Sequence, residues 1–479
     1  MVRVRIAPSP TGFLHIGNAR AALYNFLFAK KHGGTFVLRV EDTDKQRSTS
    51  AFEKDILEGL RWLGLQWDEG PDVGGEFGPY RQSERLESHQ IALRLLLEQG
   101  SAYFCYCTPQ ELEVDRQKAE QEKVSYRYNG RCQKKPHDKS LKAVVRFRLP
   151  EDSTNIVWED LIRGTVSVHT NTLDDFIIAR SIDSPLYNFA VVVDDAKMKI
   201  THVIRGEDHI SNTPKQILIT TALGHPLPVF GHIPLILNAD RSKMSKRKNN
   251  VSINHYREVG YLPEAMVNFL ALLGWNPGTE QELFSLDELC RVFDIDRTQK
   301  SGAIFNEEKL RWFNQQYLAK RTANEFEKMV EPFIPKLYPE INIAKTIAIV
   351  RPRITVLSEA QAQFAPFTQE LPGSYAPELL LWPKALKQSS EEELKKRTIT
   401  ILEGVQRLLS TQIQWEEHAL EQVMKTWITA QGYGVGDTLW PLRVALSGQK
   451  DSPNPFELLE ACGTELSRRR IVYAIKQLQ

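Results

Sequence analysis

The sequence predicts an α/β protein that opens with a parallel sheet and ends in a helical region. Residues 2–6 alternate as a strand, a turn containing Pro and Gly follows, and residues 18–31 have a helical pattern before a second strand at 35–40. A strand, a turn, a helix and a strand in this order open a parallel sheet. From about residue 325 the pattern is mostly helical, and a capping box at 389–392 predicts a helix through about Leu409.

Length and composition bound the number and class of domains. The chain has 479 residues, whereas one hydrophobic core stops growing near about 250–300 residues, so several domains are expected. Lys plus Arg number 61 and Asp plus Glu number 60, which argues against a basic nucleic-acid coat but permits a local RNA-binding face. The sequence has no apolar run of the roughly 18–20 residues that a membrane span needs, and five dilute cysteines predict no disulfide framework. We therefore expect a cytoplasmic protein that does not bind membranes.

A stretch of different character separates two parts of the predicted sheet. Residues from about 85 to 180 contain Cys and Tyr pairs, a polar patch and short predicted strands at 143–149 and 165–169. We interpret this stretch as an α/β insertion into the first domain. After it, the apolar runs 191–193 and 201–204 predict two further buried strands.

The first group of candidate functional residues lies where the first strand meets the helix, at residues 8–18 (PSPTGFLHIGN). Unpaired N–H groups and a partial positive charge let a helix N-terminus hold phosphates. Gly12 and Gly17 permit a close backbone approach, and His15 can donate to a phosphate oxygen. The first forty residues contain six Lys or Arg and no Asp or Glu, which favours an anion. The alternative is an ordinary turn with a surface histidine.

The second group is residues 241–248 (RSKMSKRK), of which five are cationic. Small and polar residues among the cations predict a mobile loop. Such a loop can close two ammonium groups on a triphosphate and neutralise the charge that develops when the α-phosphate is attacked. A solvated basic loop is the alternative.

Together the two groups resemble the signature motifs of class I aminoacyl-tRNA synthetases, HIGH at residues 15–18 and KMSKS at residues 243–247. Asn18 replaces the second His and Arg247 the final Ser, changes that the glutamate branch accommodates. The resemblance narrows to bacterial-type glutamyl-tRNA synthetases and is dense to about residue 315. The segments that narrow it are 5–12, 39–48, 185–195, 201–209 and 302–306.

The resemblance implies a division of the chain into domains. It implies a Rossmann-type catalytic domain over 1–84 and 181–240, an inserted acceptor-binding domain over 85–180, a stem-contact domain with the basic loop over 241–322, and α-helical anticodon-binding domains over 323–479.

The resemblance also implies an activity. L-Glutamate would react with ATP, accompanied by Mg²⁺, to form a glutamyl-adenylate, and would then be joined to the 3′-terminal adenosine of tRNA(Glu). The tRNA would be bound before activation, and the enzyme would be a monomer. Charging of tRNA(Gln) as well is the alternative, because the choice depends on side chains at the third anticodon base, for which Arg351 and Arg353 are candidates.

For the amino acid, the resemblance implies that Arg5 and Arg205 face the side-chain carboxylate. A guanidinium can bind such a group through two hydrogen bonds. The remaining glutamate-binding residues would be Tyr187 beside the carboxylate and Glu41, Ser9 and the Ala7 backbone at the α-ammonium.

For the nucleotide, the resemblance implies that His15, Lys243 and Lys246 are catalytic and stabilise the transition state. No metal ligand is expected in this site. The ATP-binding residues would be Pro8, His15, Gly17, Asn18, Asp208, Lys243, Met244, Ser245, Lys246 and Arg247.

Three cysteines have the spacing of a zinc knuckle that some bacterial relatives carry in the inserted domain: Cys105, Cys107 and Cys132. Structural zinc takes four ligands almost always, and the fourth position here is Lys134, an ammonium that cannot ligate. Tyr128 or His137 could substitute. Structural zinc is therefore possible but not favoured, and the alternative is a knuckle that packs its thiols without a metal.

Other classes fit the sequence less well. A glutaminyl-tRNA synthetase would have a β-barrel tail, whereas the last third here is helical. A truncated relative that glutamylates a tRNA base would lack the anticodon-binding part, and a small nucleotidyltransferase would need neither this length nor the Arg5 and Arg205 pair. A non-catalytic RNA-binding protein would tolerate loss of His15, Lys243 or Lys246, and all three are present.

Overall fold

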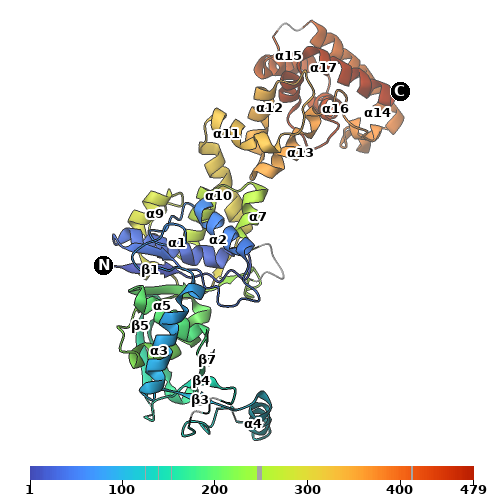
Figure 1. Ribbon diagram of the computed structural model, residues 1–479. Coiled ribbons are helices and arrows are strands. Elements are labelled where there is room, and N and C mark those ends of the chain that lie inside the picture. Colours follow the sequence, from blue (N-terminus) through green and yellow to red (C-terminus); the bar gives the residue numbers. More distant parts are fainter. Residues whose placement is uncertain (125, 137, 139, 153, 245–250, 412–413) are drawn as a thin grey trace. The chain divides into compact units, whose positions relative to one another are not determined.

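The computed structural model describes residues 1–124, 126–136, 138, 140–152, 154–244, 251–411 and 414–479 (Figure 1). The chain forms two compact units. The first comprises Met1–Glu258 and Pro263–Leu310, and the second comprises Val259–Leu262 and Arg311–Gln479. The core clusters are drawn from residues 37–230 in the first unit and 341–478 in the second, so each unit buries its own apolar side chains.

All described strands belong to the first unit. They are β1 (Arg3–Ile6), β2 (Thr35–Leu38), β3 (Ala102–Cys105), β4 (Val144–Phe147), β5 (Asn155–Asp160), β6 (Gly164–His169), β7 (Ile177–Ser181), β8 (Ser184–Pro185), β9 (His202–Gly206), β10 (Val229–Ile233), β11 (Ile236–Leu237) and β12 (Ala303–Ile304). The helices that begin in this unit are α1 (Ile16–Lys31), α2 (Ser50–Trp62), α3 (Leu86–Glu98), α4 (Pro109–Gln121), α5 (Tyr187–Lys197), α6 (Thr213–Ala222), α7 (Ile253–Val259), α8 (Pro263–Leu272), α9 (Leu286–Val292) and α10 (Glu307–Lys320).

A parallel layer positions the site. β1 pairs in parallel with β2, and α1 connects them. β9 lies beside β1, where the Thr201 N–H donates to the Arg3 carbonyl over 3.0 Å, and β9 pairs in parallel with β10. α1 packs on this layer and is buried on nearly every side, because α8 and α9 cover it as well. The predicted α/β fold with a parallel sheet is confirmed.

The prediction of a strand at 191–193 is wrong. These three valines lie inside α5, where every residue from Phe189 to Asp195 is buried. A short apolar run does not distinguish a buried strand from a buried helix, and the cost of valine in a helix is under about 1 kcal/mol per residue. Burial on all sides of α5 therefore outweighs the strand preference. The other predicted strand of this region is confirmed as β9.

A second, antiparallel sheet has the strand order β3-β4-β7-β8 and packs against α3 and α5. Its strands β3, β4 and β7 come from the stretch predicted as an insertion, which ends near residue 180, and β8 follows that stretch. In Figure 1 the sheet leads to α4. β5 and β6 come from the same stretch but join the sheet of β9 and β10, because Phe230 of β10 is the partner of Asp160. The division of the first unit into separate domains stays a prediction.

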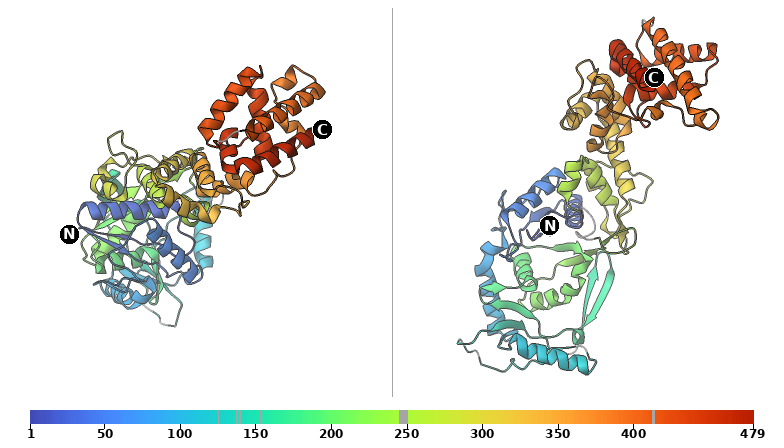
Figure 2. Two further views of the ribbon diagram at one scale, coloured as in Figure 1. Left: turned by 90° about the horizontal axis from the view of Figure 1, so that it is seen from above. Right: turned by 90° about the vertical axis from the view of Figure 1, so that its right-hand side faces the viewer.

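The second unit is helical in its described residues, as predicted. After α10 its helices are α11 (Ala323–Val330), α12 (Ile343–Val350), α13 (Ala360–Phe364), α14 (Glu391–Ser410), α15 (Glu417–Ala430), α16 (Val435–Ser447) and α17 (Pro455–Leu478). The predicted capping box is present one residue further along the chain, with Ser390 as the N-cap and Glu393 as its partner. α14, α16 and α17 pack together, coloured orange to red in Figures 1 and 2. Among the described residues, none of the helices has both the length and the apolarity that crossing a membrane would require.

The separate cores predict that fragment 1–322 folds without the rest of the chain. It should give one cooperative thermal transition, at a lower temperature than the full chain, because the Leu357 N–H that bonds the Gly260 carbonyl is removed. Fragment 1–290 is the control, since it ends inside α9 and lacks β12, the partner of β11. Circular dichroism melts check both. A fragment 1–322 that melts without cooperativity, like fragment 1–290, would contradict the two-unit organisation.

Candidate active site

A cavity of about 370 Å³ opens at the carboxyl ends of β1 and β9. This edge is where open parallel sheets bind ligands. The cavity brings together all the predicted site residues that the structure describes: Arg5, Ala7, Pro8, Ser9, His15, Gly17, Asn18, Glu41, Tyr187, Arg205, Asp208, Lys243 and Met244. Ser245, Lys246 and Arg247 lie outside the described residues. Sequence reasoning missed further lining residues, among them Arg20 and His209.

His15 is the N-cap of α1. Its Nδ1 accepts a hydrogen bond from the Gly17 N–H over 2.9 Å, so the neutral ring carries its proton on Nε2. That N–H is the kind of donor that a phosphate oxygen needs. A Cβ at position 17 would come within 3.2 Å of the His15 ring, so a larger residue would crowd it. The first turn of α1 contains no acidic residue, which keeps its N-terminus suited to an anion.

The basic loop is anchored at this cavity on both flanks. Met244 lines the cavity on one side, and on the other the Val251 carbonyl accepts from the Ile16 N–H over 2.9 Å. Lys243 lies 3.5 Å from the Asp208 carboxylate, and both side chains are about half exposed. An exposed ion pair contributes only about 0–1 kcal/mol, so Lys243 can leave Asp208 for a triphosphate at little cost.

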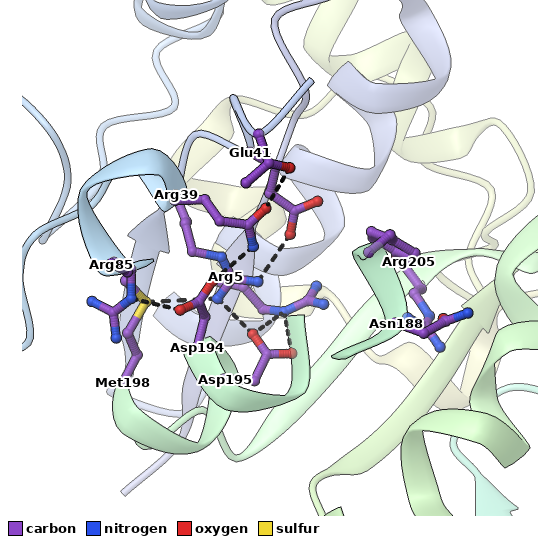
Figure 3. A network of polar contacts seen from close by, with 12 residues as sticks. Arg5, Arg39, Glu41, Arg85, Asn188, Asp194, Asp195, Met198 and Arg205 are labelled. Atoms are coloured by element: carbon purple, nitrogen blue, oxygen red, sulfur yellow. Dashed lines mark hydrogen bonds and ion pairs between the residues drawn. The ribbon is translucent and has the colours of Figure 1, made fainter. Parts of the chain in front are cut away.

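Four buried charges form a neutral cluster at one wall of the cavity (Figure 3). Asp195 accepts from Arg39 Nη1 over 2.7 Å and from Arg5 Nε over 3.2 Å, and Arg39 Nη2 donates to Glu41 over 3.1 Å. Arg39 is fully buried. Burial opposes ionisation of Asp195, but Arg5 and Arg39 hold the pKa of its carboxyl below the usual value. When Glu41 is ionised, two cations and two anions leave this cluster without net charge.

Glu41 is the acidic member of the cluster that lines the cavity. Burial raises the pKa of its carboxyl, while Arg39 and Arg5 oppose that rise. A ligand ammonium beside Glu41 would favour the charged form further, since an opposite charge within a few ångströms does so. The side chain is thus placed to accept an ammonium group.

Arg205 carries a buried charge of a different kind. It is 6% exposed, and its three nitrogens donate to neutral acceptors: His232 Nε2 at 3.3 Å, Gln216 Oε1 at 2.8 Å and Thr213 Oγ1 at 2.9 Å. Within the described part of the chain, no carboxylate lies within ion-pair distance of it. Burial lowers the pKa of Arg205. A cation held this way is suited to a ligand carboxylate.

Tyr187 and His209 lie beside Arg205. The Tyr187 hydroxyl is 3.1 Å from His209 Nδ1. Burial and the neighbouring charge of Arg205 lower the pKa of His209 to about 4, so this ring is neutral near pH 7. Burial also raises the pKa of Tyr187. The pair therefore adds hydrogen-bonding groups without adding charge.

The three cysteines converge in the first unit. The thiols of Cys105, Cys107 and Cys132 all lie within 4.8 Å of one another, and the Tyr128 hydroxyl is 3.3 Å from Cys105 and 3.6 Å from Cys107. Two sulfurs on a tetrahedral zinc are about 3.8 Å apart, given Zn–S bonds of about 2.3 Å. The Cys107 and Cys132 sulfurs are 3.7 Å apart. Burial raises the pKa of Cys107 to about 11, so the thiol would need a metal to ionise.

Comparisons with known proteins all match this chain to tRNA synthetases. Residues 1–312 match the family of class I tRNA synthetases (E and Q), catalytic domain, and residues 325–475 match an anticodon binding domain. Curated glutamate–tRNA ligases from Anaeromyxobacter sp. strain K and Carboxydothermus hydrogenoformans are 44% and 43% identical; the alignments cover 99% and 98% of this chain, and 98% and 99% of the relatives. The crystal structure of a glutamate tRNA ligase from Elizabethkingia meningosepticum in complex with its amino acid is 35% identical, with a TM-score of 0.87 and full coverage of both chains.

The neutral cluster predicts that Arg39→Met lowers the free energy of unfolding by about 3–5 kcal/mol, because it leaves Glu41 and Asp195 buried as like charges. Arg81→Met is the control. Arg81 binds Glu53 over 2.8 Å at the surface, so its loss should cost about 0–1 kcal/mol. Urea denaturation of both full-length variants measures the difference. Equal losses would mean that the cluster does not stabilise the site.

Proposed function

Because the chain belongs to the class I tRNA synthetases of the glutamate and glutamine group, we propose that this cavity is where it activates glutamate with ATP. Its activity is that of a glutamate–tRNA ligase, as in the curated relatives aligned over their full length. Glutamate, ATP and tRNA are its substrates. The reaction has two steps, and residues of the cavity can be assigned to each.

In the first step, the α-carboxylate of glutamate attacks the α-phosphate of ATP and pyrophosphate leaves. Nothing covalent forms on the protein, so its contribution is positioning and charge stabilisation. The His15 Nε2–H and the Lys243 ammonium are the described donors for the phosphates, and Lys246 is the further cation that we assign to the transition state. Mg²⁺ that enters with ATP would neutralise part of the triphosphate.

In the second step, the 2′-hydroxyl of the terminal adenosine of tRNA attacks the adenylate carbonyl and AMP leaves. Glu41 would hold the α-ammonium of glutamate throughout, with Ser9 and the Ala7 carbonyl beside it. Tyr187 would donate toward the side-chain carboxylate. The amino acid is thereby fixed at both ends before either attack.

The observation that carries the substrate assignment is the unpaired buried charge of Arg205. The cluster of Arg5, Arg39, Glu41 and Asp195 is neutral by itself, and the α-ammonium and α-carboxylate of an amino acid also cancel. Two buried guanidiniums of the cavity then have no carboxylate within ion-pair distance among the described residues, those of Arg20 and Arg205. Arg20 donates to the Leu273 and Pro234 carbonyls, so we assign Arg205, which lies beside Tyr187, to the side chain of the amino acid. Glutamate supplies the matching negative charge, whereas glutamine would place an amide there and leave the guanidinium uncompensated.

The second unit would bind the anticodon, as the matching anticodon-binding family suggests. Arg351 and Arg353, the candidates for reading the third base, are both engaged within the unit. Arg351 Nη2 donates to carbonyls at the end of α10, and Arg353 Nη2 donates to Glu457 over 2.7 Å. We therefore propose tRNA(Glu) as the partner and keep tRNA(Gln) as the alternative. We also propose that the protein is a monomer and acts in the cytoplasm.

For the cysteine cluster we propose a structural zinc ion with Tyr128 as the fourth ligand. Three thiolates and a phenol satisfy the four positions that structural zinc requires. Arg146 lies over the Tyr128 ring at 3.9 Å and would offset the negative charge of the thiolates. Lys134 is then not required as a zinc ligand. His137, the other candidate for the fourth ligand, lies outside the described residues.

Arg205→Ala should raise the glutamate KM and reduce the preference for glutamate over glutamine in kcat/KM, which such a site can set as high as about 10⁴–10⁵. The ATP KM should change little, since Arg205 is on β9 and remote from His15 in the chain. Aminoacylation of purified tRNA(Glu) with each amino acid measures this. The double variant Arg5→Ala, Arg205→Ala tests whether Arg5 compensates for the loss of Arg205. An unchanged ratio of glutamate to glutamine kcat/KM in the double variant would contradict the assignment.

The zinc proposal predicts one equivalent of zinc per chain after purification without chelators. Tyr128→Phe should weaken zinc binding in competition with a chromophoric chelator by about 10–100-fold, and Cys290→Ser, at a thiol outside the cluster, should not. Elemental analysis and the competition titration check both variants. A protein that takes up no zinc when the metal is supplied would contradict the proposal.

A further inference from the structure

Three buried polar side chains lie in a row across β5, β10 and β9. In the parallel pair of β9 and β10, His232 is the register partner of Arg205, and β5 joins β10 at Asp160. Asp160 is 4% exposed and His232 is fully buried. Neither residue lines the cavity, and neither belongs to the motifs that carry the family resemblance. Their polar atoms therefore contact other parts of the protein and not a ligand in the cavity.

Asp160 is fixed as an ionised acceptor. Its Oδ1 accepts from three backbone N–H groups, those of His232 at 3.1 Å, Ile162 at 3.0 Å and Arg163 at 3.0 Å. Its Oδ2 lies 2.5 Å from His232 Nδ1. Burial opposes the charge, but these hydrogen bonds hold the pKa of Asp160 below its usual value. An acceptor-only carboxylate requires a proton on His232 Nδ1.

The proton on Nδ1 determines what the other nitrogen of His232 can do. Burial lowers the pKa of His232, so the ring stays neutral and Nε2 keeps a lone pair. That lone pair faces two donors, Arg205 Nε at 3.3 Å and the Thr213 hydroxyl at 3.1 Å. Because the Thr213 hydroxyl can instead donate to the His209 carbonyl at 3.3 Å, the lone pair is available to Arg205. The opposite tautomer, or the protonated ring, would place an N–H against the N–H of Arg205.

The Asp160–His232 pair thus fixes one edge of the Arg205 guanidinium. Gln216 and Thr213 fix one N–H on each terminal nitrogen, and Gln216 is itself held by a hydrogen bond to Asn188 over 3.0 Å. Every acceptor is neutral, so the plane of the guanidinium is set without neutralising it. A guanidinium has five N–H groups, and Nη2 uses its second one in a long contact of 3.5 Å with the His209 carbonyl. This weakly held N–H and the remaining N–H of Nη1 suit the two oxygens of a carboxylate.

We propose that Asp160 and His232 are positioning residues that hold Arg205 for the side-chain carboxylate of glutamate and so set the preference for glutamate. This inference rests on the proposed role of Arg205. It differs from that role because it assigns specificity to two residues that do not touch the substrate. Asp160 acts through the tautomer of His232, and His232 acts through the orientation of Arg205.

The sharpest variant is Asp160→Asn, which keeps the size of the side chain. The three backbone N–H groups require the amide oxygen on their side, so the amide NH₂ must face His232. Nδ1 then has to accept, the ring proton moves to Nε2, and two donors face each other at Arg205. His232→Leu is the second variant, because it removes the acceptor at similar volume.

Both variants should raise the glutamate KM by about 10–100-fold, the range expected when a charged group loses a buried hydrogen bond. The kcat and the ATP KM should change little, and the ratio of glutamate to glutamine kcat/KM should fall by a similar factor. A purely structural role would instead lower kcat and the melting temperature and leave the KM values and the ratio unchanged. Aminoacylation of tRNA by the full-length enzyme, with both amino acids, separates the two outcomes.

His202→Leu is the matched control, since His202 is on the same strand as Arg205 but lies 2.8 Å from the Thr201 hydroxyl and packs against the Phe28 ring. It should leave the ratio unchanged. An unchanged ratio in Asp160→Asn and His232→Leu, when Arg205→Ala lowers it, would overturn the positioning pair alone. Should Arg205→Ala also leave the ratio unchanged, the proposed substrate contact would fail and the pair with it. A fall in kcat that leaves the glutamate KM and the ratio unchanged would overturn the pair as well.

Discussion

The site depends on one electrostatic constraint: the guanidinium of Arg205 is buried, and none of the described residues supplies a carboxylate within ion-pair distance of it. Burying an unpaired charge is costly unless hydrogen bonds or a ligand compensate it. Here three neutral side chains supply the hydrogen bonds, and the neighbouring charges cancel among themselves through Asp195. In the role that we propose for Arg205, the free-energy cost of burying this charge is offset when a ligand carboxylate binds, and a neutral analogue does not offset it.

The fold makes this arrangement available because its parallel strands end at one edge. β1 brings Arg5, β2 leads into Glu41, and β9 brings Arg205, so ionisable side chains from three strands line one cavity. The helix that follows β1 presents its N-terminus and His15 to the same space. The residues that we propose for amino-acid selection and for phosphate binding therefore lie in one cavity but on different elements.

The sequence predicted the parts of this site that are local in the chain. The strand, turn and helix around His15 and the helical second unit follow from periodicity and capping residues, and the cavity collects the described residues that the motifs indicated. The side chains that support them were missed. Arg39 reaches Asp195 and Asp160 reaches His232 across 156 and 72 residues of chain, and no local pattern encodes such pairs.

Two further limits of sequence reasoning have physical causes. The valines at 191–193 were predicted as a strand because β-branched apolar runs occur in both buried strands and buried helices, and only the packing around α5 distinguishes them. The cysteine spacing left Tyr128 and His137 open as a fourth ligand, because Tyr128 approaches the thiols only when β3 and its following loop are folded. In both cases the missing information is a tertiary contact.

The decisive measurement is a crystal structure of the full-length protein with glutamate bound, because the role assigned to Arg205 fixes which way the amino acid lies in the cavity. We expect the side-chain carboxylate oxygens to lie about 2.7–2.9 Å from the terminal nitrogens of Arg205, with the α-ammonium beside Glu41. Glutamate bound in the opposite sense, with its side chain away from Arg205, would contradict this assignment.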